Sequence, residues 1–173
     1  MATNTVQTGS ATSTGVFTSE FLLKHWQGHR ALTRRVIEAF PEKELFSFSV
    51  GGMRPFAELA MEMIDMGGPG IVGAATDVWK KVEELDHYDK KAIPTTKQAL
   101  LDRWDEITGI IESYWPQISD ERLREVALAF GMYENPVYKT LFYFIDNEIH
   151  HRGQGYVYLR ALGIEPPPFW DRP

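Results

Sequence analysis

The fold is best indicated by one stretch of the sequence, Asn147-Glu148-Ile149-His150-His151-Arg152-Gly153-Gln154. It lies within the longest segment of helical character, residues 136–162. Pro136 suits the first turn of a helix because it lacks an N–H that would be unpaired there, and Asn135 is a suitable N-cap. Gly163 is an expected left-handed stop, and the prolines at 166–168 prevent the helix from resuming. We therefore predict one helix from Pro136 to about Leu162.

One apolar face runs along this predicted helix. Its aliphatic and aromatic members are Val137, Leu141, Phe144, Ile145 and Leu159. At about 100° per residue, His151 falls within that face, Asn147 lies on its flank one turn earlier, and His150 points the opposite way. We therefore predict that His151 faces the protein interior and that His150 lies near solvent.

The same stretch resembles the signature of the DinB-like family. The resemblance is carried by Glu-Ile-His-His-Arg-Gly-Gln at 148–154, by Tyr-Leu-Arg-Ala-Leu-Gly at 158–163 and by the prolines that follow. Members of that family typically have a histidine, three further residues, and a second histidine followed by Arg-Gly-Gln. The resemblance implies an all-α, four-helix bundle with long crossover connections and extra short helices. It also implies a divalent metal held by three histidines, one from the second helix and two from the last.

This chain departs from the family pattern at two of the three ligand positions. The earlier histidine of the last helix falls on Asn147, and aligning the second predicted helix places Glu62 where the third histidine usually stands. The metal site that the resemblance implies is therefore Glu62, Asn147 and His151, with nickel, zinc or manganese as the ion. A carboxylate suits a harder ion such as manganese, whereas a neutral Asn oxygen weakens the affinity for zinc or nickel. The alternative is a metal-free polar cluster, in which Glu62 accepts a hydrogen bond from His151 and Asn147 donates or accepts another.

A second pair of histidines lies in the first predicted helix, which begins at Thr18 or Ser19 and ends near Phe40. His25 and His29 are four residues apart, a spacing that lets two imidazoles on one helix share a metal. Half-buried histidines among aromatic side chains are also commonly structural. The pair is therefore a rival to the site implied by the resemblance, with a structural role as its alternative.

The second predicted helix starts at 53–55 and runs to about Met66, before a Gly-Gly-Pro-Gly run at 67–70. Residues 71–85 have helical spacing and either continue this helix after a kink or form a separate one. The acidic side chains of the second helix are open to two interpretations. Glu62 either lines a cavity or belongs with Glu58 and Asp65 to a solvated acidic face.

The remaining segments complete the bundle. The third helix begins at Thr95 or Thr96 and runs to Trp115. Residues 45–52 are predicted to form an ordered loop, and residues 123–133 a short helix or an extended crossover. The long connection before the last helix permits neighbouring helices to run parallel. The core is expected to receive Phe and Trp side chains from all four helices.

Two further side chains have a possible place at the site. The charged loop 86–91 is able to cover the mouth of a cavity, although its His87 is expected to be exposed. Arg152 either binds an acidic group of a substrate or pairs with Glu148 one turn earlier.

Composition limits the function classes. The chain has 173 residues, of which 43% are hydrophobic and 13% aromatic, enough for one domain with a real core. We expect an N-terminal disordered arm at 1–17 and a bundle domain at 18–173. A net charge of −6 disfavours nucleic-acid binding, and without cysteine the chain has no disulfide and no thiolate ligand. No stretch has the length and apolarity of a membrane span or the profile of a signal peptide, so we expect a cytoplasmic protein.

Two functions fit this sequence. The two substitutions favour a non-catalytic bundle that has lost the metal and serves as a small-molecule-binding or stress-associated protein. The alternative, implied by the resemblance, is a divalent-metal-dependent hydrolase or thiol-dependent S-transferase, in which the metal polarises a substrate or lowers the pKa of a bound water or thiol. We also expect a small-molecule or thiol ligand and a homodimer, with Trp26 or Tyr156 as contact surface.

Overall fold

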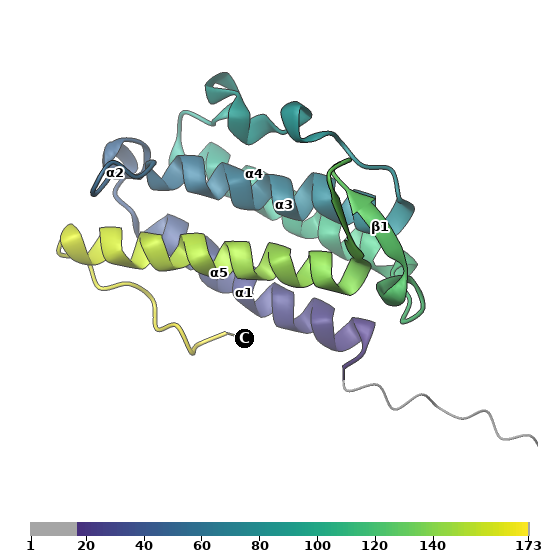
Figure 1. Ribbon diagram of the computed structural model, residues 1–173. Helices are drawn as coiled ribbons and strands as arrows, with labels where there is room; N and C mark the ends of the chain where they lie inside the picture. Colours follow the sequence, from purple (N-terminus) through teal and green to yellow (C-terminus); the bar gives the residue numbers. More distant parts are fainter. Residues whose placement is uncertain (1–16, 173) are drawn as a thin grey trace, which may run out of the picture.

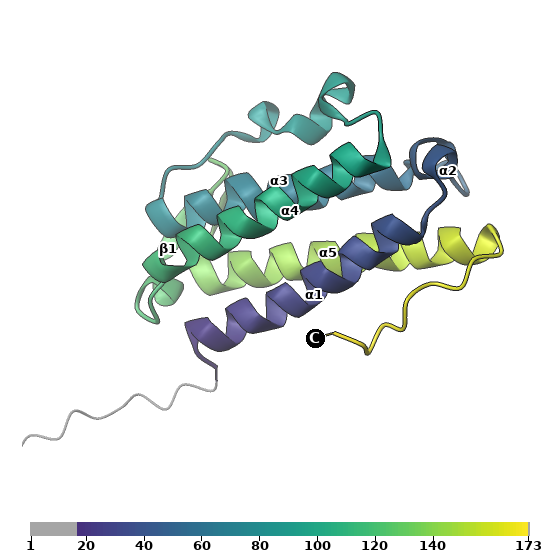
Figure 2. The same ribbon diagram turned by 180° about the vertical axis from the view of Figure 1, so that it is seen from behind.

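The computed structural model describes residues 17–172, and four long helices form its body. They are α1 (Ser19–Ala39), α3 (Phe56–Thr76), α4 (Lys97–Tyr114) and α5 (Val137–Ala161). α3 packs on α4 and α5, and α1 packs on the same two helices (Figure 1). α1 runs parallel to α5, whereas α3 and α4 both run in the opposite direction (Figures 1 and 2). The predicted four-helix bundle is confirmed.

The connections explain these directions. After α3, the chain crosses back over the outside of the bundle before α4 begins, so α3 and α4 become parallel (Figure 1). This crossover contains the 3₁₀ turns η1 (Val82–Glu84), η2 (Asp86–Tyr88) and η3 (Lys90–Ala92). The segment between α4 and α5 contains η4 (Trp115–Gln117), η5 (Arg122–Arg124) and the strands β1 (Val126–Ala129) and β2 (Tyr133–Pro136). The parallel arrangement of α3 and α4 therefore depends on the crossover between them, not on the connection before α5.

The ends of the helices follow their capping residues. Thr18 caps α1 through its hydroxyl, which accepts from the backbone N–H of Phe21 at 3.2 Å, and Thr96 caps α4 in the same way. Gly163 adopts the predicted left-handed conformation, with φ 76°. The predicted cap at Asn135 is wrong, because Asn135 pairs with Ala127 in the hairpin, and α5 begins one residue later than expected.

α3 continues through the run of glycines where we predicted an end at Met66. It includes Pro69 and ends at Thr76, with Asp77 as a C-cap of left-handed φ 63°, so residues 71–76 continue the helix, as one alternative expected, but the expected end near 85 is wrong. A Cβ added at Gly68 would lie 2.7 Å from Ile107 of α4, so this glycine permits close packing of the two helices. Tertiary packing therefore overrides the weak helix propensity of the segment.

A short helix and a hairpin were not predicted as such, although the first strand of the hairpin lies in residues 123–133, for which an extended crossover was one alternative. A short helix α2 (Glu42–Ser47) occupies the first part of the expected loop at 45–52, and it buries Leu45 completely. The strands β1 and β2 form an antiparallel hairpin whose turn contains Phe130 and Gly131 with positive φ. In β1 the inward and outward residues are all apolar, which hides the alternation that usually identifies a strand.

The core is aromatic, as expected, with contributions from all four long helices. These are Trp26, Phe56, Trp104 and Phe144, none more than 1% exposed. Trp26 is therefore not available as a dimer surface, which corrects that expectation. Among residues 17–172, no helix is long and apolar enough to cross a membrane.

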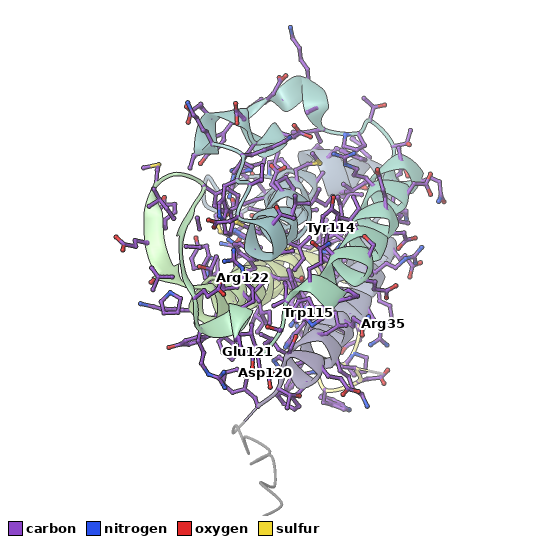
Figure 3. All side chains as sticks on the ribbon, turned by 90° about the vertical axis from the view of Figure 1, so that its right-hand side faces the viewer. Arg35, Tyr114, Trp115, Asp120, Glu121 and Arg122 are labelled. Carbon is purple, nitrogen blue, oxygen red and sulfur yellow. The ribbon has the colours of Figure 1, made fainter. Side chains whose placement is uncertain are left out.

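The connection before α5 joins the ends of α1 and α3. The indole N–H of Trp115 donates to the Ser19 carbonyl at 3.1 Å, and Asp120 accepts from the Ser19 backbone N–H at 3.0 Å. Arg122 donates to the Ala74 carbonyl at 2.9 Å, near the end of α3. Figure 3 looks at this end of the bundle and labels Trp115, Asp120 and Arg122. These bonds hold the base of the hairpin in a defined position.

The two chain ends differ in how much of them the structure describes. Residues 1–16 of the expected N-terminal arm, and Pro173, lie outside the described residues. Phe17, the last residue of that arm, packs edge-on against Phe142 of α5, with ring centroids 5.5 Å apart. At the other end, the chain after α5 returns to α1, where Arg35 pairs with Asp171 at 2.7 Å.

Candidate functional site

The three residues of the implied metal site meet between α3 and α5. Glu62 Oε1 accepts a hydrogen bond from the Asn147 side-chain amide at 2.8 Å and lies 3.0 Å from His151 Nε2. Asn147 and His151 are buried, at 8% and 6% exposed, and the Glu62 side chain is 19% exposed. The predicted orientations of His151, inward, and His150, outward, are both confirmed. Glu62 is therefore the common acceptor of Asn147 and His151.

Arg54 supplies a positive charge on the other side of Glu62. Its guanidinium lies 2.5 Å from Glu62 Oε2. Burial, the largest single influence, raises the pKa of Glu62, but hydrogen bonds from His151, Arg54 and Asn147 together outweigh it and hold that pKa far below its ordinary value. Glu62 is therefore a carboxylate that three neighbouring donors keep ionised.

Two features of this cluster bear on metal binding. Asn147 Oδ1 is buried without a hydrogen-bond partner, so it is the one oxygen of the cluster that is left over. His151 Nδ1 lies 2.9 Å from Gln154 Oε1, a contact that orients the imidazole. Within the described residues, no three His, Cys, Asp or Glu side chains gather in a way that could hold a metal ion. A metal held by these three residues would have Asn147 Oδ1 as its third ligand.

A cavity of about 460 Å³ begins at Glu62 and extends toward the hairpin. Its walls come from α3, the crossover that contains η1 and η2, the hairpin and the first half of α5. Aromatic rings line much of it: Tyr88, Phe130, Tyr133, Phe142, Tyr143 and Phe144. Burial and the nearby Glu62 carboxylate raise the pKa of Tyr143, so this phenol stays neutral. The cavity can accept a small, largely apolar molecule with a few polar groups.

His87 belongs to the wall of this cavity, although we predicted it to be exposed. Its side chain is 6% exposed, and its ring Nδ1 lies 2.6 Å from Asp65 Oδ2. The same carboxylate oxygen accepts from the His87 backbone N–H at 2.7 Å. Asp65, which we placed on a solvated face, is only 1% exposed. The loop thus does cover the cavity, as expected, but through a buried Asp–His pair.

Arg152 points away from the cavity, toward α1. It is 6% exposed, lies 3.7 Å from Glu148 and donates to the Thr33 hydroxyl at 3.0 Å. Glu148 also lies 3.8 Å from Arg30, so one buried carboxylate serves two guanidinium groups. The interpretation of Arg152 as a substrate-binding residue is therefore wrong, and the interpretation as a partner of Glu148 is confirmed.

The rival histidine pair on α1 is structural. His29 Nδ1 lies 2.8 Å from Arg152, and His29 Nε2 lies 2.9 Å from Arg172. Burial, reinforced by these two arginines and by His25, lowers the pKa of His29 to about 3. Both ring nitrogens face a guanidinium, which leaves neither for a metal.

Sequence reasoning missed the residues that the crossover and the hairpin bring to the cavity. A signal existed for Asp65, because the helix around it is apolar on nearly every side and such a helix is buried, so an acidic residue within it needs a partner. No comparable signal existed for His87. Its partner lies 22 positions away, and the contact depends on how the crossover folds back.

Comparisons with known proteins agree with the fold. The model of the DinB family matches residues 11–171. A DinB-like protein from Bacillus cereus ATCC 10987 is 19% identical, with a TM-score of 0.69 over 87% of this chain and 97% of that one. A DinB-like protein, YjoA, from Bacillus subtilis is 18% identical, with a TM-score of 0.66 over 88% of this chain and 99% of the other. No curated protein matches the sequence.

Proposed function

Because this chain belongs to the DinB family, we propose that it has kept the family fold without the metal and binds a small aromatic molecule in the cavity beside Glu62. In this proposal Glu62, which is held by Asn147 and His151, forms part of the wall of the binding site. Self-association and a cytoplasmic location belong to the same proposal. It describes a binding protein and assigns no reaction.

The cavity is the observation that carries the proposal. Its volume of about 460 Å³ lies in the range of small-molecule sites, which is about 300–1,000 Å³. Aromatic rings predominate among its large side chains, and planar ligands gain both apolar burial and ring contacts from such walls. Polar groups lie on several of the lining elements, among them Glu62, Asn135 and Thr140. A ligand that presents one or two polar atoms and a ring suits this arrangement.

The chemistry of the Glu62 cluster supports the metal-free part of the proposal. Glu62 already accepts from an imidazole, an amide and a guanidinium, so both of its carboxylate oxygens have donor partners. Arg54 stands at the carboxylate as a competing cation, and a metal beside it would be repelled. Asn147 offers only a neutral oxygen, which is a weak ligand for zinc or nickel. The donor set fits hydrogen bonding better than it fits a divalent ion.

Titration calorimetry with 4-nitroanisole, a neutral aromatic probe, tests the binding site. We expect saturable binding to the wild-type protein and its loss in Ala129→Leu, because Ala129 is a buried residue of the cavity wall and a larger side chain fills the space. Ala161→Leu makes the same change on the exposed surface of α5 and should bind like wild type. Equal binding by all three proteins, or by none, would refute this site.

A further inference from the structure

Asp65 and His87 form a pair that the proposed binding site does not yet explain. Asp65 lies on α3 and is 1% exposed. Its Oδ2 accepts from both the backbone N–H and the ring Nδ1 of His87, at 2.7 and 2.6 Å. The imidazole is thereby fixed in position and in orientation.

This contact also decides which ring nitrogen carries the proton. An ionised carboxylate can only accept, so the proton of a neutral His87 sits on Nδ1 and leaves a lone pair on Nε2. Among the described residues, Nε2 has no hydrogen-bond partner, and His87 is part of the cavity lining. An imidazole that is held by a buried aspartate is a good proton acceptor, because the aspartate stabilises the imidazolium that forms. His87 therefore offers a basic nitrogen at the edge of an aromatic cavity.

The other groups around the cavity limit what His87 can receive. The Tyr88 ring lies beside the imidazole and is tilted by 38° to it, with ring centroids 4.1 Å apart. The titratable groups that share the cavity with His87 come from α3, η2, β2 and α5, and they are Glu62, Tyr88, Tyr133, Lys139, Tyr143 and Asp146. Glu62 is already paired with Arg54 and with His151. Lys139 is then the cation of this set, and it can favour an anionic ligand.

We propose that Asp65 and His87 are a proton-accepting dyad, and that the preferred ligands of the cavity are phenols whose hydroxyl proton passes to His87 Nε2 on binding. This inference rests on the proposed function, since it names the class of molecule for the same cavity. In the step, the phenol O–H bond breaks and an N–H bond forms at Nε2. The products are a phenolate and an imidazolium whose Nδ1–H remains bonded to Asp65. No oxidant, reductant or second reactant takes part.

The probe for this step is 4-nitrophenol, whose phenolate absorbs visible light and whose phenol does not. We choose a pH about one unit below the probe's own pKa, where about a tenth of the free probe is ionised. We expect more than about half of the bound probe to be phenolate, since that requires a shift of only about one pKa unit. His87→Gln keeps the backbone N–H bonded to Asp65 but removes the basic nitrogen, so it should bind the probe without the phenolate band.

Two controls separate the dyad from other causes. Lys139→Gln tests whether a nearby cation alone ionises the probe, and we expect its phenolate band to persist. 4-Nitroanisole has the same ring but no proton to give, so its binding to wild type should produce no phenolate band. The proposal is overturned if wild type binds 4-nitrophenol without the band, if His87→Gln keeps the band, or if Lys139→Gln alone loses it.

The outcomes also distinguish this inference from the binding proposal. Binding of 4-nitroanisole together with protonated 4-nitrophenol would refute the dyad and leave the binding site standing. If neither 4-nitroanisole nor 4-nitrophenol binds, the dyad and the binding site are both refuted. The wild-type spectrum decides between these results even if the His87 variant fails to fold.

Discussion

At the residue scale, the site is organised by carboxylates that serve several donors. Glu62 accepts from three side chains, and Asp65 accepts twice from His87. Sequence reasoning found Glu62 and His151 through the resemblance and through helical periodicity. It could not find the role of Asp65, because the decisive partner lies on a crossover whose path is set by packing. Charged residues in a nearly apolar helix are thus better interpreted as paired than as solvated.

Glu62→Gln should lower the free energy of unfolding at neutral pH by about 1–3 kcal/mol. The variant loses hydrogen bonds to a charged acceptor, and the NH₂ of its new amide lies against the donor groups of Arg54 and Asn147. The folded-state pKa of Glu62 lies below its ordinary value of 4.5. The stabilisation is therefore present above that value and is lost as pH falls below it. Urea unfolding of both proteins at neutral and acidic pH measures this, and a difference that is independent of pH would contradict it.

His29 should make the protein less stable in mild acid. Its pKa falls from 6.5 to about 3 on folding, so below pH 6.5 the unfolded chain takes up a proton that the folded protein refuses. The free energy of unfolding is expected to decrease as pH falls from 6.5 toward 3. In His29→Gln this part of the slope should disappear, whereas His150→Gln, at an exposed position, serves as the control. An unchanged slope in His29→Gln between pH 6.5 and 5 would show that another group is responsible.

At the element scale, periodicity predicted the four long helices because each must bury a continuous apolar stripe. α1 and α4 begin at the predicted threonine caps. Short elements were not predictable in the same way. α2 has only 6 residues, and the hairpin pairs two 4-residue strands of which one is apolar on both faces. Their positions are set by contacts with distant segments, and the cavity wall that they build was missed with them.

Close packing of α5 against α3 should make two neighbouring glycines behave oppositely. A Cβ at Gly155 would lie 2.4 Å from Phe56, whereas a Cβ at Gly153 would meet nothing within 4 Å. We expect Gly155→Ala to destabilise by about 1–3 kcal/mol through overpacking. Gly153→Ala should stabilise by up to about 1 kcal/mol, because alanine is the better helix former. Thermal unfolding of the two variants checks the contrast. Similar shifts of the thermal midpoint in both variants would show that Gly155 is not closely packed against Phe56.

At the scale of the whole molecule, the homodimer expected from the resemblance stays a prediction. Trp26 is buried, whereas Tyr156, the other expected contact residue, is half-buried and stays a candidate. The outer face of the hairpin exposes Val126, Leu128 and Met132, each more than half exposed, beside the cavity. We expect a dimer mass by light scattering at high concentration and a shift toward monomer in Leu128→Glu. Val157→Glu, near the other end of α5, should keep the dimer, and a monomer mass for wild type would remove the expectation.

The fold and the site were predictable to different degrees for one physical reason. A bundle is specified by periodic burial, which a single sequence displays, whereas a cavity is specified by which distant segments meet. The last helix therefore predicted the fold and placed His151. Whether the cluster beside it holds a metal depends on Arg54, whose approach to Glu62 only the structure displays.

Metal content is the most direct test of the proposed metal-free cluster of Glu62, Asn147 and His151. Elemental analysis of untagged protein, after incubation with nickel, zinc or manganese and removal of free ion, should find no stoichiometric metal in either the wild type or His151→Ala. The thermal midpoint of wild type should not rise with any of the three ions. A near-stoichiometric metal in wild type that is lost in His151→Ala would contradict a metal-free cluster. It would mean that Glu62, Asn147 and His151 rearrange into a metal site.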